Sequence, residues 1–370
     1  MKYDVVVVGA GLAGAVMAER AASAGKSVLV IEKRDHIAGN CYDYRDENGI
    51  IIHKYGPHAF HTEQKKVFDY LSRFTDWHPY KHKVTALVKG KNVILPVNYD
   101  TIDQLFGKKD GAIFKEKLLS IYPEGSKVFI ADIIGSDDEV VRKYARIVYE
   151  EIYLNYSKKQ WGVDPKELDP MVLKRVPLWM NREPYYFPDK YQAMPKEGYT
   201  AMVEKMLESE KIEVVLGKDY KEIEGKVSCG RIVHTGAIDG YFGDKYGHLP
   251  YRSLRFEYET HDAEYYQRST SVNYPGTEPY TRITEFKHFL DDRSTKTVIA
   301  REYPEEHVPG KNIPFYPMPL RVNYDIYNKY AGEALKLKNV TFIGRLAEYK
   351  YYNMDQVVLR ALEEYERIGG

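Results

Sequence analysis

A glycine motif near the start of the chain constrains the fold more than any other feature of the sequence. Gly9-x-Gly11-x-x-Gly14 directly follows the β-branched run Val5–Val8 and opens an alanine-rich stretch, Leu12–Ala24. In a β-α-β unit the first glycine permits a tight turn, the second lets the backbone approach a pyrophosphate, and the third lets helix and strand pack closely. The free N–H groups at the start of the helix then face the phosphates. The motif in this setting predicts a Rossmann-like unit that binds a dinucleotide.

The residues after this motif indicate which dinucleotide is bound. A second buried strand, Ser27–Ile31, ends at Glu32, where a carboxylate accepts hydrogen bonds from a ribose diol. After Glu32-Lys33-Arg34 the chain continues with Gly39-Asn40, in a place where FAD enzymes often have a glycine pair that wraps the cofactor. Ala38 replaces the first glycine of that pair. The sequence therefore favours FAD over NAD without deciding between them.

Periodicity along the rest of the chain predicts an α/β fold with α+β insertions. Lys83–Val97 contains two β-rich runs around Gly90-Lys91-Asn92, which is typical of a hairpin. From about residue 101 to residue 174, apolar residues recur at helical spacing, and one apolar face comprises Val140, Val141, Tyr144, Ile147, Val148 and Ile152. An antiparallel sheet is expected from the runs Leu254–Tyr258, Ser269–Val272, Tyr280–Phe286 and Thr297–Arg301. Further buried strands are expected at Ile212–Leu216, Arg231–His234 and Val340–Ile343, with a last helix from Met354.

These patterns predict three substructures. An FAD-binding, discontinuous Rossmann-like domain would comprise residues 1–80, 190–245 and 335–370. A helical substrate domain would comprise residues 100–175, with a mobile loop near 165–185. An antiparallel sheet domain would comprise residues 81–99 and 246–334.

Composition argues against several classes of protein. Lys+Arg and Asp+Glu both number 54, so the chain lacks the basic excess that is usual in nucleic-acid binders. The two cysteines, Cys41 and Cys229, make neither a disulfide framework nor a zinc site, which favours a reducing, cytoplasmic setting. No segment approaches the roughly 18 apolar residues of a membrane helix. The 34 tyrosines suit stacking against bases and sugars, although most would simply fill half-buried strand positions.

Three histidines lie close together at His53, His58 and His61. A metal shared by His58 and His61 would require a helix, whereas Gly56-Pro57 predicts a loop, so we expect no metal site. We expect His58 or a backbone group of this loop to lie near a flavin ring. His53 is as well explained as a loop histidine with ordinary hydrogen bonds.

Four arginines and one helix start are further candidates. Arg175, Arg252, Arg282 and Arg345 lie beside aromatic or turn residues, and two converging guanidinium groups would suit the diphosphate of a nucleotide-sugar. Any single arginine is nevertheless more often a surface or salt-bridged residue. Asn353 precedes the last helix with Gln356 three residues on, which predicts an N-cap and its partner. The positive end of that helix could stabilise a reduced flavin, or the helix could be an ordinary surface one.

Several strings together resemble the UDP-galactopyranose mutase family of bacterial type, in the family's order and over essentially the whole chain. Gly9–Gly14 and Val30–Arg34 are shared by many flavoproteins. The strings that are specific to the family are His53–Thr62, Tyr156–Gly162, Pro250–Leu254, Pro279–Arg282 and, most distinctively, Gly344–Tyr352. The resemblance implies FAD as the cofactor, a UDP-hexose as the substrate and a cytoplasmic homodimer with a role in cell-wall polysaccharide biosynthesis.

The resemblance also implies roles for individual residues. Arg175, on a mobile loop, and Arg282 would clamp the diphosphate and, with His58, act in catalysis. Substrate contacts are implied for Tyr156, which would stack on uracil, and for Trp161, Tyr186, Arg252, Tyr316, Tyr351 and Asn353. The family often has Asp where this chain has Asn353, so the residue can still cap the helix but lacks the carboxylate. Cofactor contacts are implied for Gly9, Gly11, Leu12, Gly14, Glu32, Lys33, Gly39, Asn40, His58, Gly344, Arg345 and Met354.

The implied reaction interconverts UDP-galactopyranose and UDP-galactofuranose without net redox change. N5 of reduced FAD would attack the anomeric carbon, UDP would leave, and the sugar would reclose as a furanose from the flavin adduct before UDP returns. Two alternatives stay open at this point. One is an FAD oxidoreductase of the amine-oxidase type, and the other is a non-catalytic flavoprotein that binds UDP-sugars.

Overall fold

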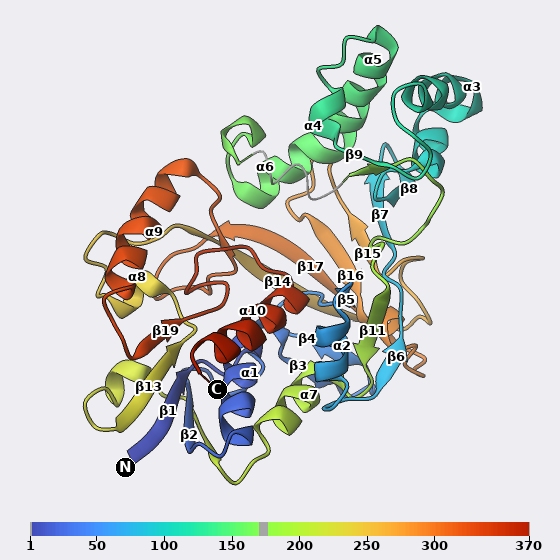
Figure 1. Ribbon diagram of the computed structural model, residues 1–370. Helices are drawn as coiled ribbons and strands as arrows, with labels where there is room; N and C mark the ends of the chain where they lie inside the picture. The colour runs from blue at the N-terminus through green and yellow to red at the C-terminus, as the bar shows by residue number, and fades with distance from the viewer. Residues whose placement is uncertain (1, 170–176, 370) are drawn as a thin grey trace. The chain divides into compact units, whose positions relative to one another are not determined.

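The computed structural model describes residues 2–169 and 177–369, and the chain divides into two units (Figure 1). The first unit comprises Met1–Tyr80, Asp189–Tyr251 and Pro309–Gly370, and the second comprises Lys81–Pro188 and Arg252–Val308. The helical and sheet substructures expected from the sequence thus fall in one unit. Residues 309–334, expected with the sheet, belong to the first unit.

A five-stranded parallel sheet forms the centre of the first unit. Its strands are β12 (Ile212–Leu216), β2 (Val28–Glu32), β1 (Lys2–Val8), β13 (Ser228–His234) and β19 (Val340–Phe342), in that order. Val5 pairs with Val28 on one side and with Arg231 on the other. Every residue of β2 is buried, as expected for a β-branched strand inside a parallel sheet. The predicted Rossmann-like domain, assembled from the start, middle and end of the chain, is confirmed.

Helices α1 (Leu12–Ser23) and α10 (Met354–Arg367) pack against each other beside this sheet (Figure 1). Helix α1 buries ten of its twelve residues, because alanine and glycine let its backbone approach neighbouring elements closely. The other helices of the unit are α2 (Lys65–Leu71), α7 (Gly198–Leu207), α8 (Ile238–Tyr241) and α9 (Arg321–Ala334). Its other strands are β3 (Asp43–Arg45), β4 (Ile51–His53), β5 (Phe60–Thr62), β6 (Trp77–Pro79), β11 (Tyr191–Pro195) and β18 (Tyr316–Pro317).

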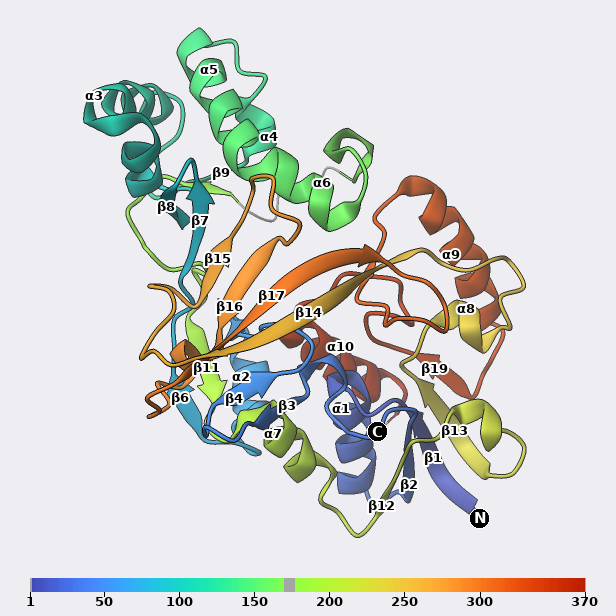
Figure 2. The same ribbon diagram turned by 180° about the vertical axis from the view of Figure 1, so that it is seen from behind.

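A second sheet lies in the second unit, and Figure 2 shows its longest strands side by side. Within this unit its strand order is β14 (Tyr251–His261), β17 (Thr297–Glu306), β16 (Arg282–Glu285), β15 (Ser271–Asn273), β7 (Val84–Val88) and β8 (Lys91–Leu95). The expected hairpin is present as β7 and β8. One pair corrects the prediction of an antiparallel sheet, because β15 runs parallel to β7 with Ser271 opposite Val84. Between β7 and β15 the chain forms the helices of this unit, the segment Asp189–Tyr251 of the first unit and β14. Such a long connection permits a parallel pairing that a short hairpin forbids.

The helical part of the second unit contains α3 (Tyr99–Leu119), α4 (Ile130–Ile133), α5 (Glu139–Val148), a π-helical segment (Tyr149–Leu154) and α6 (Asn155–Trp161). Two short strands, β9 (Lys127–Val128) and β10 (Leu178–Trp179), pair beside it. Of the apolar face predicted over 140–152, Val141, Tyr144, Val148 and Ile152 are buried and the other two pack against the same core. Within residues 2–169 and 177–369, no helix has both the length and the apolar character that a membrane span requires.

Candidate functional site

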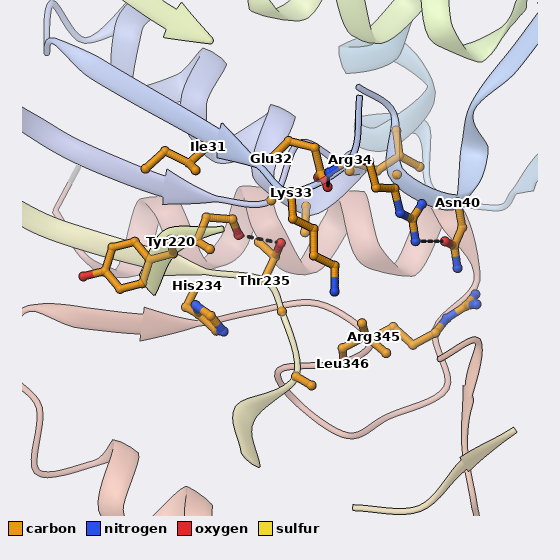
Figure 3. A pocket seen from close by; sticks show the side chains of 18 of the residues that line it. Ile31, Glu32, Lys33, Arg34, Asn40, Tyr220, His234, Thr235, Arg345 and Leu346 are labelled. Carbon is orange, nitrogen blue, oxygen red and sulfur yellow. Dashed lines mark hydrogen bonds between the residues drawn. The ribbon is translucent and has the colours of Figure 1, made fainter. Parts of the chain in front are cut away.

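A pocket opens where β1, β2 and β13 end, at Val8, Glu32 and His234. Figure 3 shows Glu32 and His234 in its lining. Its volume is about 370 Å³, within the range of small-molecule sites. The lining comes from the glycine motif, the end of β2, residues 38–41, residues 218–224, residues 234–241 and the start of α10. In open parallel sheets this edge, outside the carboxyl ends of the strands, is where dinucleotides bind.

The glycine motif brings backbone against backbone at the floor of this pocket. A Cβ atom on Gly14 would lie 1.9 Å from the carbonyl oxygen of Gly9, so no side chain fits there. A Cβ atom on Gly39 would lie 2.9 Å from Cα of Gly11. Gly9, Gly11, Leu12 and Gly39 line the pocket, whereas Gly14 and Gly344 do not and act in packing.

The Glu32 side chain holds the glycine turn between β1 and α1. One carboxylate oxygen accepts from N of Ala10 at 2.9 Å and the other accepts from N of Arg34 at 3.0 Å. A carboxylate has about four acceptor positions. Glu32 therefore holds the glycine turn and keeps acceptor capacity for a ribose diol.

Two polar atoms at the pocket lack a partner among the described residues. The guanidinium of Arg34 donates from Nη2 to Oδ1 of Asn40 at 2.9 Å, as Figure 3 shows, but its buried Nη1 has no hydrogen-bond acceptor. His234 lines the pocket, and its Nδ1 is likewise buried without a partner. Burial lowers the pKa of His234 to about 4, so the ring is neutral. A bound ligand with phosphate or ribose acceptors and a heterocycle would satisfy both atoms.

His58 reaches the pocket from a loop that neighbouring histidine and tyrosine side chains hold in place. Its Nδ1 lies 2.8 Å from the carbonyl oxygen of Gly56 and must donate to it, which leaves Nε2 as an acceptor. Its backbone N donates to Nδ1 of His53 at 3.0 Å, and the Tyr199 hydroxyl donates to its carbonyl oxygen at 3.1 Å. Burial lowers the pKa of His58 and of His53 to about 3, so both rings are neutral near pH 7. His61 lies apart from them on β5 and contacts Asp189, with 2.9 Å between Nδ1 and Oδ2.

Helix α10 presents its N-terminus to the same pocket through Met354 and Val357. The predicted cap is confirmed, since Oε1 of Gln356 accepts from N of Asn353 at 2.9 Å in a capping box. Sγ of Cys41 lies 3.5 Å from Sδ of Met354. With a neutral Asn353 at the cap, the positive end of the helix dipole is not offset at that position.

Arg345 lines the pocket and is held by aromatic rings and carbonyl groups. Tyr316 and Tyr351 stack with ring centroids 5.1 Å apart, and Cζ of Arg345 lies 5.3 Å and 5.2 Å from the two centroids. Nη2 of Arg345 donates to the carbonyl oxygen of Tyr352 at 2.7 Å. These partners are neutral, and no carboxylate among residues 2–169 and 177–369 forms a salt bridge with this guanidinium.

A second group of predicted residues lies in the second unit around Arg282. Nη2 of Arg282 donates to the Tyr156 hydroxyl at 2.9 Å, and its Nη1 has only the Glu302 carboxylate, 4.0 Å away, among the described residues. Burial raises the pKa of Tyr156 to about 12. Burial opposes the charge on Arg282, but Tyr156 and Glu302 outweigh it and raise the pKa of Arg282 well above its ordinary value. Tyr186 interacts electrostatically with both Tyr156 and Arg282.

The other predicted residues of this unit lie at the end of α6. Trp161 is buried as its last residue. Nε of Arg252 donates to the carbonyl oxygen of Gln160 at 2.9 Å, and Nη2 donates to that of Lys159 at 3.3 Å, so Arg252 caps this helix. Arg175 lies outside the described residues.

Comparison with known proteins identifies the family to which this chain belongs. The family model for UDP-galactopyranose mutase matches residues 151–351, and a model for NAD(P)-binding Rossmann-like domains matches residues 7–74. A protein named "Probable UDP-galactopyranose mutase" from Klebsiella pneumoniae is 36% identical over 97% of this chain and 93% of its own length. The chain belongs to the UDP-galactopyranose mutase family.

Two further relatives extend the comparison within this family and its fold. A dTDP-fucopyranose mutase from Escherichia coli is 35% identical over 97% of this chain and 96% of its own length. The solved structure of a reduced UDP-galactopyranose mutase matches with a TM-score of 0.74 and 16% identity, covering 100% of this chain and 94% of that one. At that identity the structural likeness shows the fold.

Family membership and the pocket together identify an enzyme, an isomerase, whose cofactor is FAD. The close backbone approach at Gly11 and Gly39, the unpartnered Nη1 of Arg34 and the unpartnered Nδ1 of His234 all fit an extended dinucleotide. The sequence predicted Glu32, Lys33, Asn40, His58, Arg345 and Met354 as cofactor contacts, and all six line the pocket. It missed Arg34, His234 and the segment 218–224. Arg34 adjoins the predicted Glu32-Lys33, but no local signal marks the other two.

His53 is the last residue of β4 and not a loop residue as expected, and its burial predicts an acid-sensitive fold. In the unfolded chain His53 has a pKa of about 6.5, whereas burial keeps it neutral in the folded protein down to about pH 3. Its contribution to stability is therefore complete above pH 6.5 and is lost as the pH falls, by about 1.4 kcal/mol per pH unit. His53→Asn retains an acceptor for N of His58 without the titration. Between pH 7 and pH 5 we expect its unfolding free energy, measured by urea denaturation with FAD present, to fall by about 2 kcal/mol less than that of the wild type. Equal losses of unfolding free energy in the variant and the wild type would show that His53 is not held neutral in the folded protein.

Proposed function

We propose that this chain interconverts UDP-galactopyranose and UDP-galactofuranose, with FAD in its reduced form. The observation that carries the proposal is the Arg282 guanidinium, hydrogen-bonded to a tyrosine hydroxyl and only distantly paired with Glu302. Such a cation is suited to the diphosphate of a nucleotide-sugar. The mutases among the relatives support this substrate class.

The second unit supplies the groups for the nucleotide. Arg282 would neutralise charge on the diphosphate as the bond between sugar C1 and UDP breaks. The rings of Tyr156 and Trp161, five residues apart on α6, would give apolar faces for uracil and ribose. The Tyr186 hydroxyl would donate to a phosphate oxygen. Arg175 would join Arg282 on the diphosphate, as the family resemblance implies.

The first unit supplies the cofactor site. When bound and reduced, FAD supplies a nucleophilic ring nitrogen, N5, for the anomeric carbon of the sugar. Nε2 of His58 offers a hydrogen-bond acceptor at this pocket, and the N-terminus of α10 favours a negative charge there. Tyr316 and Tyr351 would offer hydroxyl groups to the sugar or the diphosphate. The reaction needs no protein general base in this scheme, so the side chains bind and orient.

The direct test is conversion of UDP-galactofuranose by the purified holoenzyme, followed by chromatography. We expect UDP-galactopyranose to form with dithionite-reduced protein and not with oxidised protein. Consumption of O2 by the oxidised protein, in proportion to an oxidised product, would favour an amine-oxidase type of reaction instead. Binding of UDP and FAD without conversion would favour a non-catalytic protein. Turnover of dTDP-fucopyranose in place of the UDP-sugar would keep the reaction and change the substrate, the outcome that the Escherichia coli relative suggests.

We further propose that the chain acts as a cytoplasmic homodimer in cell-wall polysaccharide biosynthesis. The family resemblance supports all three parts. The two cysteines are free, which agrees with a reducing compartment. A single species of about 43.0 kDa in light scattering, the mass of one chain, would contradict the dimer.

A further inference from the structure

We propose that Lys159 is a positioning residue that fixes the nucleotide-binding helix α6 to the loop leading into Arg282. The proposal rests on the proposed function, in that α6 carries Tyr156 and Trp161. Lys159 belongs to neither the cofactor pocket nor the set of predicted substrate contacts. Its place in the chain, beside Lys158 on a polar helix, is that of an ordinary solvated lysine.

The ammonium group of Lys159 is fully used by backbone carbonyl groups. Nζ donates to the carbonyl oxygen of Tyr274 and, at 3.0 Å each, to those of Glu278 and Tyr280. An ammonium has three donors, so these bonds exhaust its capacity. No described carboxylate forms an ion pair with it, and burial lowers the pKa of Lys159. The ammonium group therefore binds three backbone carbonyl groups and does not take part in a salt bridge with a described residue.

The three carbonyl groups belong to one loop, residues 274–281, which connects β15 to β16. Asn273 at the end of β15 accepts from Nε of Arg282 at 3.3 Å, and Arg282 is the first residue of β16. The hydrogen bonds from Lys159 therefore span the loop from its first residue, Tyr274, to Tyr280, two residues before Arg282. On the helix, Lys159 is three residues after Tyr156, whose hydroxyl accepts from Nη2 of Arg282 at 2.9 Å.

Two connections therefore link the same two elements. The Arg282–Tyr156 hydrogen bond joins the groups that would touch substrate, and Lys159 holds the backbones that carry them. Arg252 fixes the end of α6 independently, through the carbonyl oxygens of Gln160 and Lys159. Binding groups must be held within about 0.5 Å of their productive positions, so loss of such a connector is expected to weaken nucleotide binding.

The test compares two lysines of the same helix. Lys159→Met keeps the aliphatic stem but leaves three carbonyl oxygens without their donor. Lys158→Met is the matched control, because Lys158 is exposed and lies 3.7 Å from Asp164 in a surface ion pair. For Lys159→Met we expect UDP to bind at least tenfold more weakly in calorimetry, with a normal flavin spectrum and FAD content. We expect the control to match the wild type in all three.

Kinetics and a second variant separate positioning from mere stability. We expect the Lys159→Met loss in kcat/KM to arise mainly from KM, measured well below the melting temperature of each variant. A lower melting temperature with unchanged UDP affinity and KM would overturn the proposal. If Lys159→Met does not fold, Lys159→Arg decides: its planar donors cannot converge on three carbonyl oxygens, so at least threefold weaker UDP binding is expected and unchanged binding overturns the proposal.

The readout also distinguishes this proposal from the function it rests on. A wild-type protein that binds UDP but converts no nucleotide-sugar would refute the proposed reaction, while the Lys159 comparison would still be decided by UDP affinity. A wild-type protein that does not bind UDP would refute both.

Discussion

Replacing Arg282 with alanine is expected to lower kcat/KM for the UDP-sugar by at least about 10²-fold while FAD stays bound, a loss of about 2.7 kcal/mol in transition-state stabilisation. The guanidinium is half-buried, donates to Tyr156 and has its nearest described carboxylate 4.0 Å away, so its charge is available to a diphosphate. In the proposed reaction, charge develops on the diphosphate as UDP leaves the sugar, so removing the cation is expected to cost more in the transition state than in the bound substrate. Steady-state kinetics with reduced enzyme measures the effect.

A control must separate lost electrostatics from lost structure. Arg255→Ala removes an exposed arginine of β14 in the same unit, where Nε lies 2.9 Å from Oε1 of Glu305. Surface ion pairs contribute little, so near-normal turnover is expected. Arg282→Lys should recover only part of the activity, since lysine cannot donate to Tyr156 and a phosphate in one plane. Turnover of Arg282→Ala within threefold of the wild type would remove this residue from the site.

The features that the sequence predicted well depend on residues that are close to one another in the chain. The glycine motif, the strand before it and Glu32 are adjacent in the chain, so spacing alone implied the turn that the structure contains. The capping box of α10 and the hairpin β7–β8 are equally local. The residues that make these contacts are close in the chain, three positions apart for Asn353 and Gln356 and 22 positions apart for Ala10 and Glu32.

The parts that were not predictable depend on burial and distant pairing. The parallel pair β15–β7 joins segments far apart in the chain, and no alternation of apolar residues specifies which neighbour a strand takes. Arg34 and His234 stand out because one nitrogen of each is buried without a partner in the described part of the chain, which is a property of the folded protein. Lys159 did not stand out in the sequence because a lysine that binds carbonyl groups is indistinguishable there from one that faces water. The Arg252 cap was hidden for the same reason.

The second large effect is expected for Gly39→Ala, which should reduce FAD affinity at least tenfold. A Cβ atom on Gly39 would lie 2.9 Å from Cα of Gly11, and neither atom can rotate away, because the first is fixed to its own Cα and the second is backbone. The two segments of the pocket floor must separate, and the turn that approaches the pyrophosphate moves with them. Gly39 also has φ +56, next to Ala38, which already has φ 67. The flavin-to-protein absorbance ratio after purification, and titration of the apoprotein with FAD, give the measurement.

Gly49→Ala is the control that isolates the clash from the backbone strain. Gly49 has φ +79, so alanine there costs a similar roughly 1 kcal/mol of left-handed strain, but a Cβ atom added to it would meet no other atom within 4 Å. It lies outside the pocket lining, and full FAD content is expected. Comparable FAD loss in both variants would mean that strain and not backbone contact controls binding. If Gly39→Ala binds FAD stoichiometrically and with the wild-type dissociation constant, the close contact between Gly11 and Gly39 is not required for FAD binding.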